Sequence, residues 1–468
     1  MDSNPDPSVV DGHAERWGIR RPSGLVHPRD LLLTPEQTRI EKSRYLSAKF
    51  QARETQKLWR QVWQVACRAE SIPRPGDRLP YSIGDQEIVL VRQRDGRVRA
   101  FYNACRHRGS MLVREAGHAE QLRCPYHGWC WQLDGQLAEI PDRYLTSGID
   151  DAEYALREIA CDTWAGYVFV NLAGRNAKPL HDYLGLLVER LAPFRMDEQR
   201  LVSWHTLEIA CNWKVLTEAF LETYHVPAIH PKLTTLLDES NTGYERLGIH
   251  HRMWIPYGLP SVRYPGTTSR EVYESWLREH FRERHLDWNG APDAPDPAAW
   301  EPRFDASGEL EGAGKPRDYL LERQLAEGRL RGHDYSGLAT DQLIDVDHYL
   351  FFPNFVILAK ADDTFIIRSR PHGPDPECCL VDVMRLQPRG HGESDAPAAS
   401  QQWLSANEED VLANIGEVIW QDFRNVAGVQ RGLRADALEH VTLSANDVRI
   451  RWFHDDIEAL FEDAPAGT

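Results

Sequence analysis

Several stretches of the chain have the short apolar or alternating pattern of β-strands, with turn residues between them. Glu87–Arg92 and Val98–Tyr102 flank a turn at Asp95-Gly96. Gly166–Asn171 is a nearly continuous apolar run, which is typical of a strand buried on both faces. A further hairpin signal is Asp134-Gly135. Together these patterns predict a small all-β domain over roughly residues 60–172.

Other stretches have the wider apolar spacing of helices. Residues 34–66 and 178–226 are predicted to be mostly helical, and residues 407–430 are predicted to form one amphipathic helix. Three later segments predict strands: Asp347–Lys360, Thr364–Arg370 and 379–386. The second half of the chain is therefore expected to combine a sheet with helices.

Two segments differ in composition from the rest. Residues 1–25 are rich in Pro, Asp and Gly, so we expect them to be loosely ordered. Residues 262–340 are charged and rich in Pro and Gly, with short helical stretches such as Tyr319–Arg329. We interpret this second segment as an insertion that forms a lid or a subunit contact.

Composition narrows the class of protein. A chain of 468 residues suggests two or three domains. No apolar run approaches the length of a membrane span, and the first residues lack the basic and apolar regions of a secretory leader, so we expect a cytoplasmic protein. The net charge of −17 argues against nucleic acid or an anionic membrane as a partner. The 8 cysteines are scattered and do not suggest a disulfide framework.

Two doublets of Cys and His carry the first chemical signal. Cys105-x-His107 is followed after sixteen residues by Cys124-x-x-His127. Two thiolates and two imidazoles can hold a [2Fe–2S] cluster of the Rieske kind, with the thiolates on one iron and the imidazoles on the other. A structural zinc site is the alternative, because Cys2His2 also suits Zn²⁺. Zinc fingers usually keep like ligands together, whereas each doublet here mixes them, so the pattern favours the cluster.

The loops around these doublets narrow the type of cluster. Gly109 and Gly128 allow tight turns that direct backbone N–H groups toward the cluster. Respiratory Rieske proteins carry an additional cysteine in each loop, and those two cysteines form a disulfide. The matching positions here are Ser110 and Tyr126. By resemblance, this favours the lower-potential cluster of bacterial oxygenases.

A second group of residues follows downstream. A helix over residues 213–226, ended by Pro227, would place Glu218, Glu222 and His225 on one face. The loop after it would then bring His230 toward His225. Two imidazoles beside carboxylates suggest a mononuclear iron site of the 2-His-1-carboxylate type, which leaves positions open for O2. The alternative is a pair of ordinary surface histidines with salt-bridge partners.

With both groups present, the chain resembles the catalytic α subunit of the Rieske non-heme iron oxygenases, the aromatic-ring-hydroxylating family. The resemblance covers roughly residues 58–172, 204–235 and 345–460. It implies an α+β fold: a small all-β Rieske [2Fe–2S] domain and a larger catalytic domain, whose antiparallel sheet and helices hold the mononuclear iron. The expected divisions are an N-terminal segment that packs on the catalytic domain, the Rieske domain and the catalytic domain, at residues 1–59, 60–172 and 173–468.

The resemblance also assigns roles to residues. Cys105, His107, Cys124 and His127 become the cluster ligands. His225 and His230 become iron ligands. Glu222, three residues before His225, becomes the carboxylate that bridges the two metal centres.

One departure from the family bears on the substrate. The family usually has Asp where this chain has Glu222, and a Glu here is typical of choline-, betaine- and carnitine-type monooxygenases. The Cys that commonly flanks the histidine in those enzymes is absent, since Thr223 and Val226 flank Tyr224-His225. We expect an aromatic or other ring compound as substrate, with a quaternary ammonium or N-methyl compound as the alternative.

The third iron ligand follows from periodicity. In the 407–430 helix the expected apolar stripe contains an acid, Asp422, where an apolar residue is needed. A carboxylate among aliphatic side chains is costly unless it is paired or bound to a metal. A salt bridge to Arg424 or Arg431 is the alternative, although neither lies on its face. The family places its carboxylate ligand eight residues before a Gln-x-Gly, and Gln430-Arg-Gly432 stands at that distance. The stripe comprises Val411, Ile415, Ile419, Val426 and Val429.

The expected function is that of a terminal oxygenase. Electrons from NAD(P)H would come through a separate reductase or ferredoxin, because no G-x-G-x-x-G follows a strand here. The resemblance implies O2 and a small organic molecule as substrates, and a homotrimer or a multiple of it. Asn212 and Glu218 are candidates for supporting the iron ligands, with helix capping or a salt bridge as their alternatives. A substrate pocket is expected from Leu216, Phe220, Leu236 and Phe351–Leu358.

Two other classes of protein are alternatives. A simple electron carrier would need only the region of residues 60–172. A zinc-stabilised binding protein would hold no iron.

Overall fold

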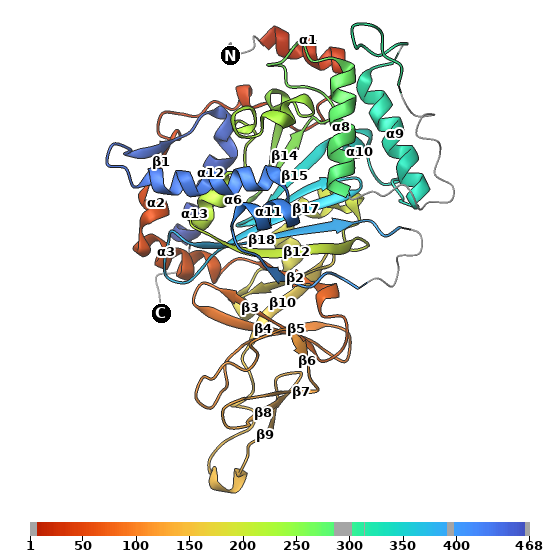
Figure 1. The fold of residues 1–468 in the computed structure, drawn as a ribbon. Helices are drawn as coiled ribbons and strands as arrows, with labels where there is room; N and C mark the ends of the chain where they lie inside the picture. Colours follow the sequence, from red (N-terminus) through yellow and green to blue (C-terminus); the bar gives the residue numbers. More distant parts are fainter. Residues whose placement is uncertain (1–6, 285–301, 313, 391–396, 464–468) are drawn as a thin grey trace.

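The computed structural model of the protein describes residues 7–284, 302–312, 314–390 and 397–463. Figure 1 shows a larger body of sheet and helices, from which a narrow β-rich part extends downward. The small part consists of strands with two short 3-10 helices, Ala69–Ser71 and Arg143–Leu145, and the larger part combines a mainly antiparallel sheet with helices. The predicted α+β fold class is therefore confirmed.

The small part contains two sheets. A 7-stranded sheet has the order β2-β11-β10-β5-β4-β3-β6, and a 3-stranded sheet has the order β7-β8-β9 at the far end of the molecule (Figure 1). The predicted hairpins are both present, because β4 and β5 meet around Asp95-Gly96, and β8 and β9 meet around Asp134-Gly135. The strands are β2 (Gln64–Arg68), β3 (Asp77–Ile83), β4 (Gln86–Arg92), β5 (Val98–Tyr102), β6 (Gly117–His118), β7 (Gln121–Arg123), β8 (Cys130–Gln132), β9 (Leu137–Glu139), β10 (Glu158–Trp164) and β11 (Tyr167–Asn171).

The larger part is organised around an 8-stranded sheet of order β13-β14-β15-β16-β17-β18-β12-β19. Neighbours pair antiparallel except β12 and β19, which are parallel. The three predicted strand segments lie in this sheet, and the first of them contains two strands. The strands are β12 (Arg200–Ile209), β13 (Gly243–Leu247), β14 (His250–Ile255), β15 (Val346–Phe351), β16 (Phe355–Lys360), β17 (Asp363–Pro371), β18 (Cys379–Gln387) and β19 (Gln402–Trp403).

Helices surround this sheet (Figure 1). Near the N-terminus β1 (Arg39–Glu41) pairs with β20 (His440–Thr442) in a separate two-stranded sheet. The helices are α1 (Pro7–Trp17), α2 (Ser43–Leu46), α3 (Ala48–Glu54), a π-helix (Thr55–Trp59), α4 (Leu180–Leu184), α5 (Leu187–Leu191), α6 (Trp213–Glu218), α7 (Val226–Ile229), α8 (Ser269–Arg284), α9 (Pro316–Arg331), α10 (Thr340–Ile344), α11 (Glu408–Asn414), α12 (Glu417–Leu433) and α13 (Val448–Asp463).

Two of the helical predictions are wrong in part. Residues 39–41 and 64–66 of the segment 34–66 are strand, and only the stretch between them is helical. In the segment 178–226 the ten residues of β12 form a strand that pairs with β18 along its length. In each case the partner strand is far away in the sequence, and pairing with it overrides the local preference for helix.

The prediction of loose order near the N-terminus is also wrong for the part that the structure describes. Trp17 at the end of α1 is fully buried, and His13 Nε2 lies 2.8 Å from the carbonyl oxygen of Pro260. Residues 1–6 of that prediction lie outside the described residues. Apolar contacts and this hydrogen bond therefore hold α1 against the large domain.

The segment 262–340 contributes α8 and α9, which lie beside each other at one side of the large domain (Figure 1). Val272 and Trp276 of α8 and Leu320 of α9 belong to one buried apolar cluster with Trp17. The predicted helical stretch Tyr319–Arg329 lies within α9. Its role as a lid or subunit contact stays a prediction.

A buried arginine joins the two parts of the molecule. Arg368 of β17 donates to the carbonyl oxygens of Val65 and Ala66 in β2, and also to the carboxylate of Asp382 in β18. A guanidinium with several fixed acceptors is a rigid connector. The small sheet is therefore anchored directly to the large one.

Among the described residues, no helix is long and apolar enough to cross a membrane.

Candidate metal centre

The predicted helix over residues 213–226 is interrupted. Asn212 caps the first turn of α6, which ends at Glu218, and the chain then turns until α7 begins at Val226. Pro227 stands in the first turn of α7, where its missing N–H removes no helical hydrogen bond. Pro227 therefore begins a short helix instead of ending a long one, and the interruption separates Glu218 from the histidine face.

The predicted helix over residues 407–430 is also divided. Gly416 has a φ of 127°, which an L side chain rarely adopts, and it separates α11 from α12. Val411, Ile419 and Val426 are buried as the stripe predicts, but Val429 is 44% exposed. The buried face of α12 therefore continues through Gln430 and Leu433, and Val429 lies off that face.

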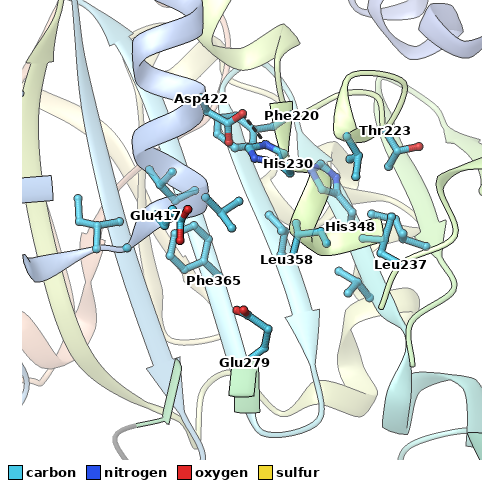
Figure 2. A pocket seen from close by; sticks show the side chains of 18 of the residues that line it. Phe220, Thr223, His230, Leu237, Glu279, His348, Leu358, Phe365, Glu417 and Asp422 are labelled. Carbon is cyan, nitrogen blue, oxygen red and sulfur yellow. Dashed lines mark hydrogen bonds and ion pairs between the residues drawn. The ribbon is translucent and has the colours of Figure 1, made fainter. Parts of the chain in front are cut away.

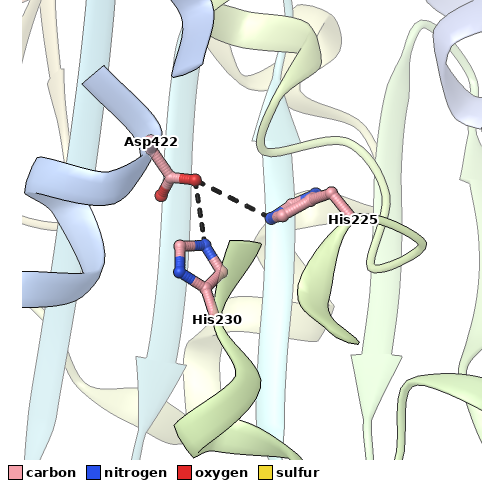
Figure 3. Close-up of side chains that lie close together, drawn as sticks. All are labelled: His225, His230 and Asp422. Atoms are coloured by element: carbon pink, nitrogen blue, oxygen red, sulfur yellow. Dashed lines mark hydrogen bonds and ion pairs between the residues drawn. The ribbon is translucent and has the colours of Figure 1, made fainter. Parts of the chain in front are cut away.

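Three side chains converge on one point although they come from separate elements. His225, His230 and Asp422 each offer a ligand atom, and these atoms lie within 4.8 Å of one another (Figure 3). Oδ1 of Asp422 lies 2.9 Å from Nε2 of His230 and 3.8 Å from Nε2 of His225. Asp422 is 4% exposed. Across the part of the chain that the structure describes, no other three His, Cys, Asp or Glu side chains meet so closely.

A hydrogen bond orients each imidazole. His225 Nδ1 lies 2.6 Å from Oε1 of Glu222, and the backbone N–H of His225 donates to Oε2 of the same carboxylate at 3.0 Å. His230 Nδ1 lies 2.7 Å from Oε1 of Gln421. An acceptor at Nδ1 fixes the proton there and leaves Nε2 as the metal-binding atom. Both Nε2 atoms face Asp422.

Charges near His225 reinforce this arrangement. Burial lowers the pKa of His225, but the hydrogen bond to Glu222 and the charges of Glu222 and Asp422 outweigh burial and raise that pKa above its ordinary value.

Gln421 was not among the predicted site residues. Its amide lies next to Asp422 in the sequence, and no periodic signal distinguishes it from other polar positions of the helix.

Two predicted supporting residues lie elsewhere. Asn212 accepts from the backbone N–H of Lys214 and donates to the carbonyl oxygens of Tyr45 and Pro376, so the capping alternative describes it. Glu218 lies 3.0 Å from the hydroxyl of Tyr45 and 2.8 Å from Nε2 of His454. In the described structure neither residue forms a hydrogen bond or ion pair with the three converging side chains, because Asn212 lies at the start of α6 and the turn after α6 separates Glu218 from His225.

Burial has a strong effect on Glu218. Loss of hydration raises its pKa to about 8, despite the opposing hydrogen bond from Tyr45 and the charge of Lys214. His454, which contacts Glu218, is also fully buried, and its burial lowers the pKa of His454 well below its ordinary value. This network is a buried structural unit between α6 and α13. Glu417, at the start of α12, pairs with Lys232 at 2.7 Å.

A cavity of about 340 Å³ opens beside the three converging residues (Figure 2). Phe220 and Leu358 line it as predicted, whereas Leu216 and Leu236 are fully buried in the core and do not. Phe351 is likewise a core residue. Figure 2 shows Glu279 of α8 at the opposite end of the cavity from Asp422, so the segment 262–340 contributes to its wall.

The four residues of the Cys-His doublets gather near the far end of the small domain. Cys105 and Cys124 are buried and lie within hydrogen-bonding reach of each other, while the rings of His107 and His127 are exposed with centroids 4.8 Å apart. Trp129 stacks on His107 at 5.0 Å. The thiols therefore lie on the inner side and the imidazoles on the outer side of one site.

This arrangement bears on the zinc alternative. Bonds to zinc are about 2.0–2.3 Å long, so its tetrahedral ligand atoms lie within about 3.8 Å of one another. The four side chains do not form such a compact group among the described residues. Gly109 and Gly128 have φ values of 78° and 74°, so both turns need glycine. The donor set fits a two-iron cluster better than a single ion.

The comparison with protein families decides the identity of the chain. The family described as "Ring hydroxylating alpha subunit (catalytic domain)" matches residues 196–463, which is more than half of the chain. The chain belongs to this family. The Rieske [2Fe-2S] domain matches residues 62–147 of the same alpha subunit. The resemblance drawn from the sequence is thereby confirmed.

Curated relatives resemble parts of this alpha subunit. The glycine betaine monooxygenase oxygenase subunit of Pseudomonas aeruginosa (strain UCBPP-PA14) is 36% identical over 185 residues, which cover 39% of this chain and 43% of the relative. The carnitine monooxygenase oxygenase subunit of Acinetobacter pittii is 30% identical over 208 residues, or 44% and 56% of the two chains. The anthranilate 1,2-dioxygenase large subunit of Acinetobacter baylyi is 30% identical over 272 residues, or 50% and 56%. The matches span about half the length of these relatives.

Solved structures resemble the fold over nearly its whole length. A quaternary ammonium Rieske monooxygenase in complex with L-carnitine has a TM-score of 0.61 at 18% identity, covering 90% of this alpha subunit and 94% of that chain. The naphthalene 1,2-dioxygenase from Rhodococcus sp. bound to indole has a TM-score of 0.61 at 17% identity, covering 91% and 95%. At these identities the likeness establishes the fold alone.

Proposed function

We propose that this alpha subunit is the terminal oxygenase of a Rieske-type system, which uses O2 and externally supplied electrons to oxidise a small organic molecule. The observation that carries the proposal is the convergence of His225, His230 and Asp422 beside a mainly apolar cavity. A simple electron carrier has no use for such a cavity. Two neutral imidazoles and one carboxylate are the donor set that suits non-heme iron and leaves coordination positions open.

The chain's own residues prepare this site. Glu222 and Gln421 hold the two imidazoles with Nε2 directed inward, which reduces the reorganisation needed when a metal binds. Apolar side chains such as Phe220 and Leu358 exclude water from the cavity. Iron bound here would supply the chemistry of O2 activation, and the protein supplies position and a dry environment.

We propose that Cys105, His107, Cys124 and His127 hold a [2Fe–2S] cluster that receives electrons from NAD(P)H through a separate reductase or ferredoxin. In one chain the loops that carry these residues lie near the end of the small domain, on the far side of the molecule from α12 (Figure 1). A short path between the centres therefore needs a neighbouring subunit, which supports a homotrimer or a multiple of it.

Glu222 is the proposed bridge in that assembly. Its carboxylate already accepts two hydrogen bonds from His225, and each carboxylate oxygen has a further lone pair for a partner. We propose that the second partner is the exposed imidazole of His127 from a neighbouring copy. In the single chain Nη2 of Arg108 lies 3.3 Å from Nε2 of His127, so Arg108 must move aside when the copies assemble.

For the substrate we place quaternary ammonium or N-methyl compounds first. Glu222 in place of the usual Asp supports this class, and relatives named for glycine betaine and carnitine support it as well. Ring compounds are the second candidate. Phe220 and Phe365 in the cavity wall support it, as does the relative named anthranilate 1,2-dioxygenase.

The test begins with the purified protein. A red-brown absorption spectrum that dithionite bleaches, with acid-labile sulfide and about three irons per chain, is expected from one cluster and one mononuclear site. A surrogate reductase with NADH and O2 then gives product from a panel of quaternary amines, N-methyl compounds, aromatic acids and neutral arenes. A colourless protein that contains zinc, or an iron protein that yields no product from any class, would contradict the proposal.

A further inference from the structure

One polar atom in the cavity wall has no partner. His348 of β15 is 2% exposed, lines the cavity beside the proposed iron ligands, and its Nε2 has no hydrogen bond among the described residues (Figure 2). A buried polar atom without a partner is costly and needs an explanation. Its position in the cavity wall suggests that a bound molecule provides the missing partner.

The neighbour behind His348 determines which tautomer the ring adopts. Nη1 and Nη2 of Arg449, on α13, lie 3.4 and 3.3 Å from Nδ1 of His348. A guanidinium can only donate hydrogen bonds, so Nδ1 must accept and the ring proton must lie on Nε2. Burial, together with the charge of Arg449, lowers the pKa of His348 well below its ordinary value, so the ring stays neutral. The cavity therefore contains a fixed N–H donor.

Arg449 also carries a charge that no carboxylate balances. It is fully buried, and its hydrogen bonds in the described structure go to His348 and to the carbonyl oxygen of Leu221, with no ion pair. Burial lowers the pKa of Arg449 to about 9, so it remains charged at neutral pH. An unbalanced buried cation favours a negative charge nearby. An anionic group in the cavity could supply that charge and accept the hydrogen bond from His348.

We infer that the substrate carries a carboxylate, which accepts a hydrogen bond from Nε2 of His348 and is attracted by Arg449 behind the ring. The inference rests on the proposed function and adds a specificity-determining residue to it. With its carboxylate at His348, the rest of the molecule extends along the apolar wall past His230 and Asp422 (Figure 2). Of the quaternary ammonium and ring compounds considered above, those with a carboxylate are then preferred over matched compounds without one.

Calorimetric binding to the purified holoenzyme tests this without electrons or O2. The probes are two matched pairs, benzoate with toluene and glycine betaine with choline. We expect wild type to bind a carboxylate at least about tenfold more tightly than its matched partner, as a charge-assisted hydrogen bond predicts. His348→Leu should lose that preference. Its affinity for toluene and choline, which carry no carboxylate, should stay unchanged. His348→Gln keeps an N–H donor and should retain most of the preference.

The outcomes separate this inference from the proposed function. Equal affinity within both pairs in wild type overturns the inference and requires no variant to fold. An unchanged preference in His348→Leu also overturns the inference. The carboxylate would then contact the metal and not His348, and the partner of His348 would be water. Absence of binding by both carboxylates at millimolar concentration overturns it as well. Because binding needs no turnover, any of these results can occur while the oxygenase activity persists.

Discussion

Substituting Glu222 with Gln tests whether this carboxylate couples the two metal centres. The two oxygens of Glu222 each accept one hydrogen bond, from Nδ1 of His225 at 2.6 Å and from its backbone N–H at 3.0 Å. A Gln side chain has one oxygen, so its NH2 group would face one of these two donors. We therefore expect Glu222→Gln to lose one charge-assisted hydrogen bond, worth about 1.5–3 kcal/mol.

That loss translates into measurable changes. Replacing the partner of a metal-binding histidine typically costs roughly 10–100-fold in metal affinity or activity. We expect Glu222→Gln to keep its Rieske spectrum, and to retain most mononuclear iron when Fe²⁺ is in excess. Turnover should fall by at least the same factor, because the reduced cluster can no longer pass its electron efficiently to the other centre. Anaerobic Fe²⁺ titration measures the affinity, and stopped-flow absorption measures reoxidation of the reduced cluster with substrate and O2.

The chain provides a matched control for this experiment. Glu218→Gln is the same chemical change four residues earlier, at an acid that contacts Tyr45 and His454 instead of the metal centre. This variant should keep the wild-type iron affinity and reoxidation rate. Wild-type reoxidation in Glu222→Gln would refute the bridge. An equal loss in both variants would mean that burial in this region, and not contact with His225, governs the rate.

Three further predictions follow from the same structure. Asp422→Ala should retain the red cluster but lose mononuclear iron and product, and iron at wild-type occupancy would show that another acid is the ligand. Cys105→Ser should abolish the Rieske electron paramagnetic resonance signal while far-ultraviolet circular dichroism stays near wild type, and persistence of that signal would exclude Cys105 as a ligand. Glu218 has a pKa of about 8 in the folded protein against an ordinary value of 4.5, so the folded state holds a proton that the unfolded state releases. Its stabilising contribution is complete below pH 4.5 and is lost as the pH rises toward 8. In urea unfolding, the free energy of unfolding of wild type relative to that of Glu218→Gln should therefore fall by about 2 kcal/mol between pH 6.5 and pH 8.

The sequence determined the parts of this protein whose signals are local. The Cys-His doublets, Glu222 and the hairpins at Asp95-Gly96 and Asp134-Gly135 each depend on residues a few positions apart. Asp422 was recognisable because a carboxylate interrupts an apolar stripe, and the structure places it beside His225 and His230. Such signals survive in a single sequence because ligand chemistry and turn geometry require particular residues at short spacings.

Which of the other candidates share a site depends on how distant elements pack together. Glu218 and Glu222 look equivalent on a continuous helix, but the turn after α6 places one beside His454 and the other beside His225. Gln421 and the pair of His348 and Arg449 gave no signal, because their partners are a hundred or more residues away in the sequence. The strand β12 was missed for the same reason. Contacts of this kind depend on which elements pack together, and that is a property of the whole fold and not of any local window of sequence.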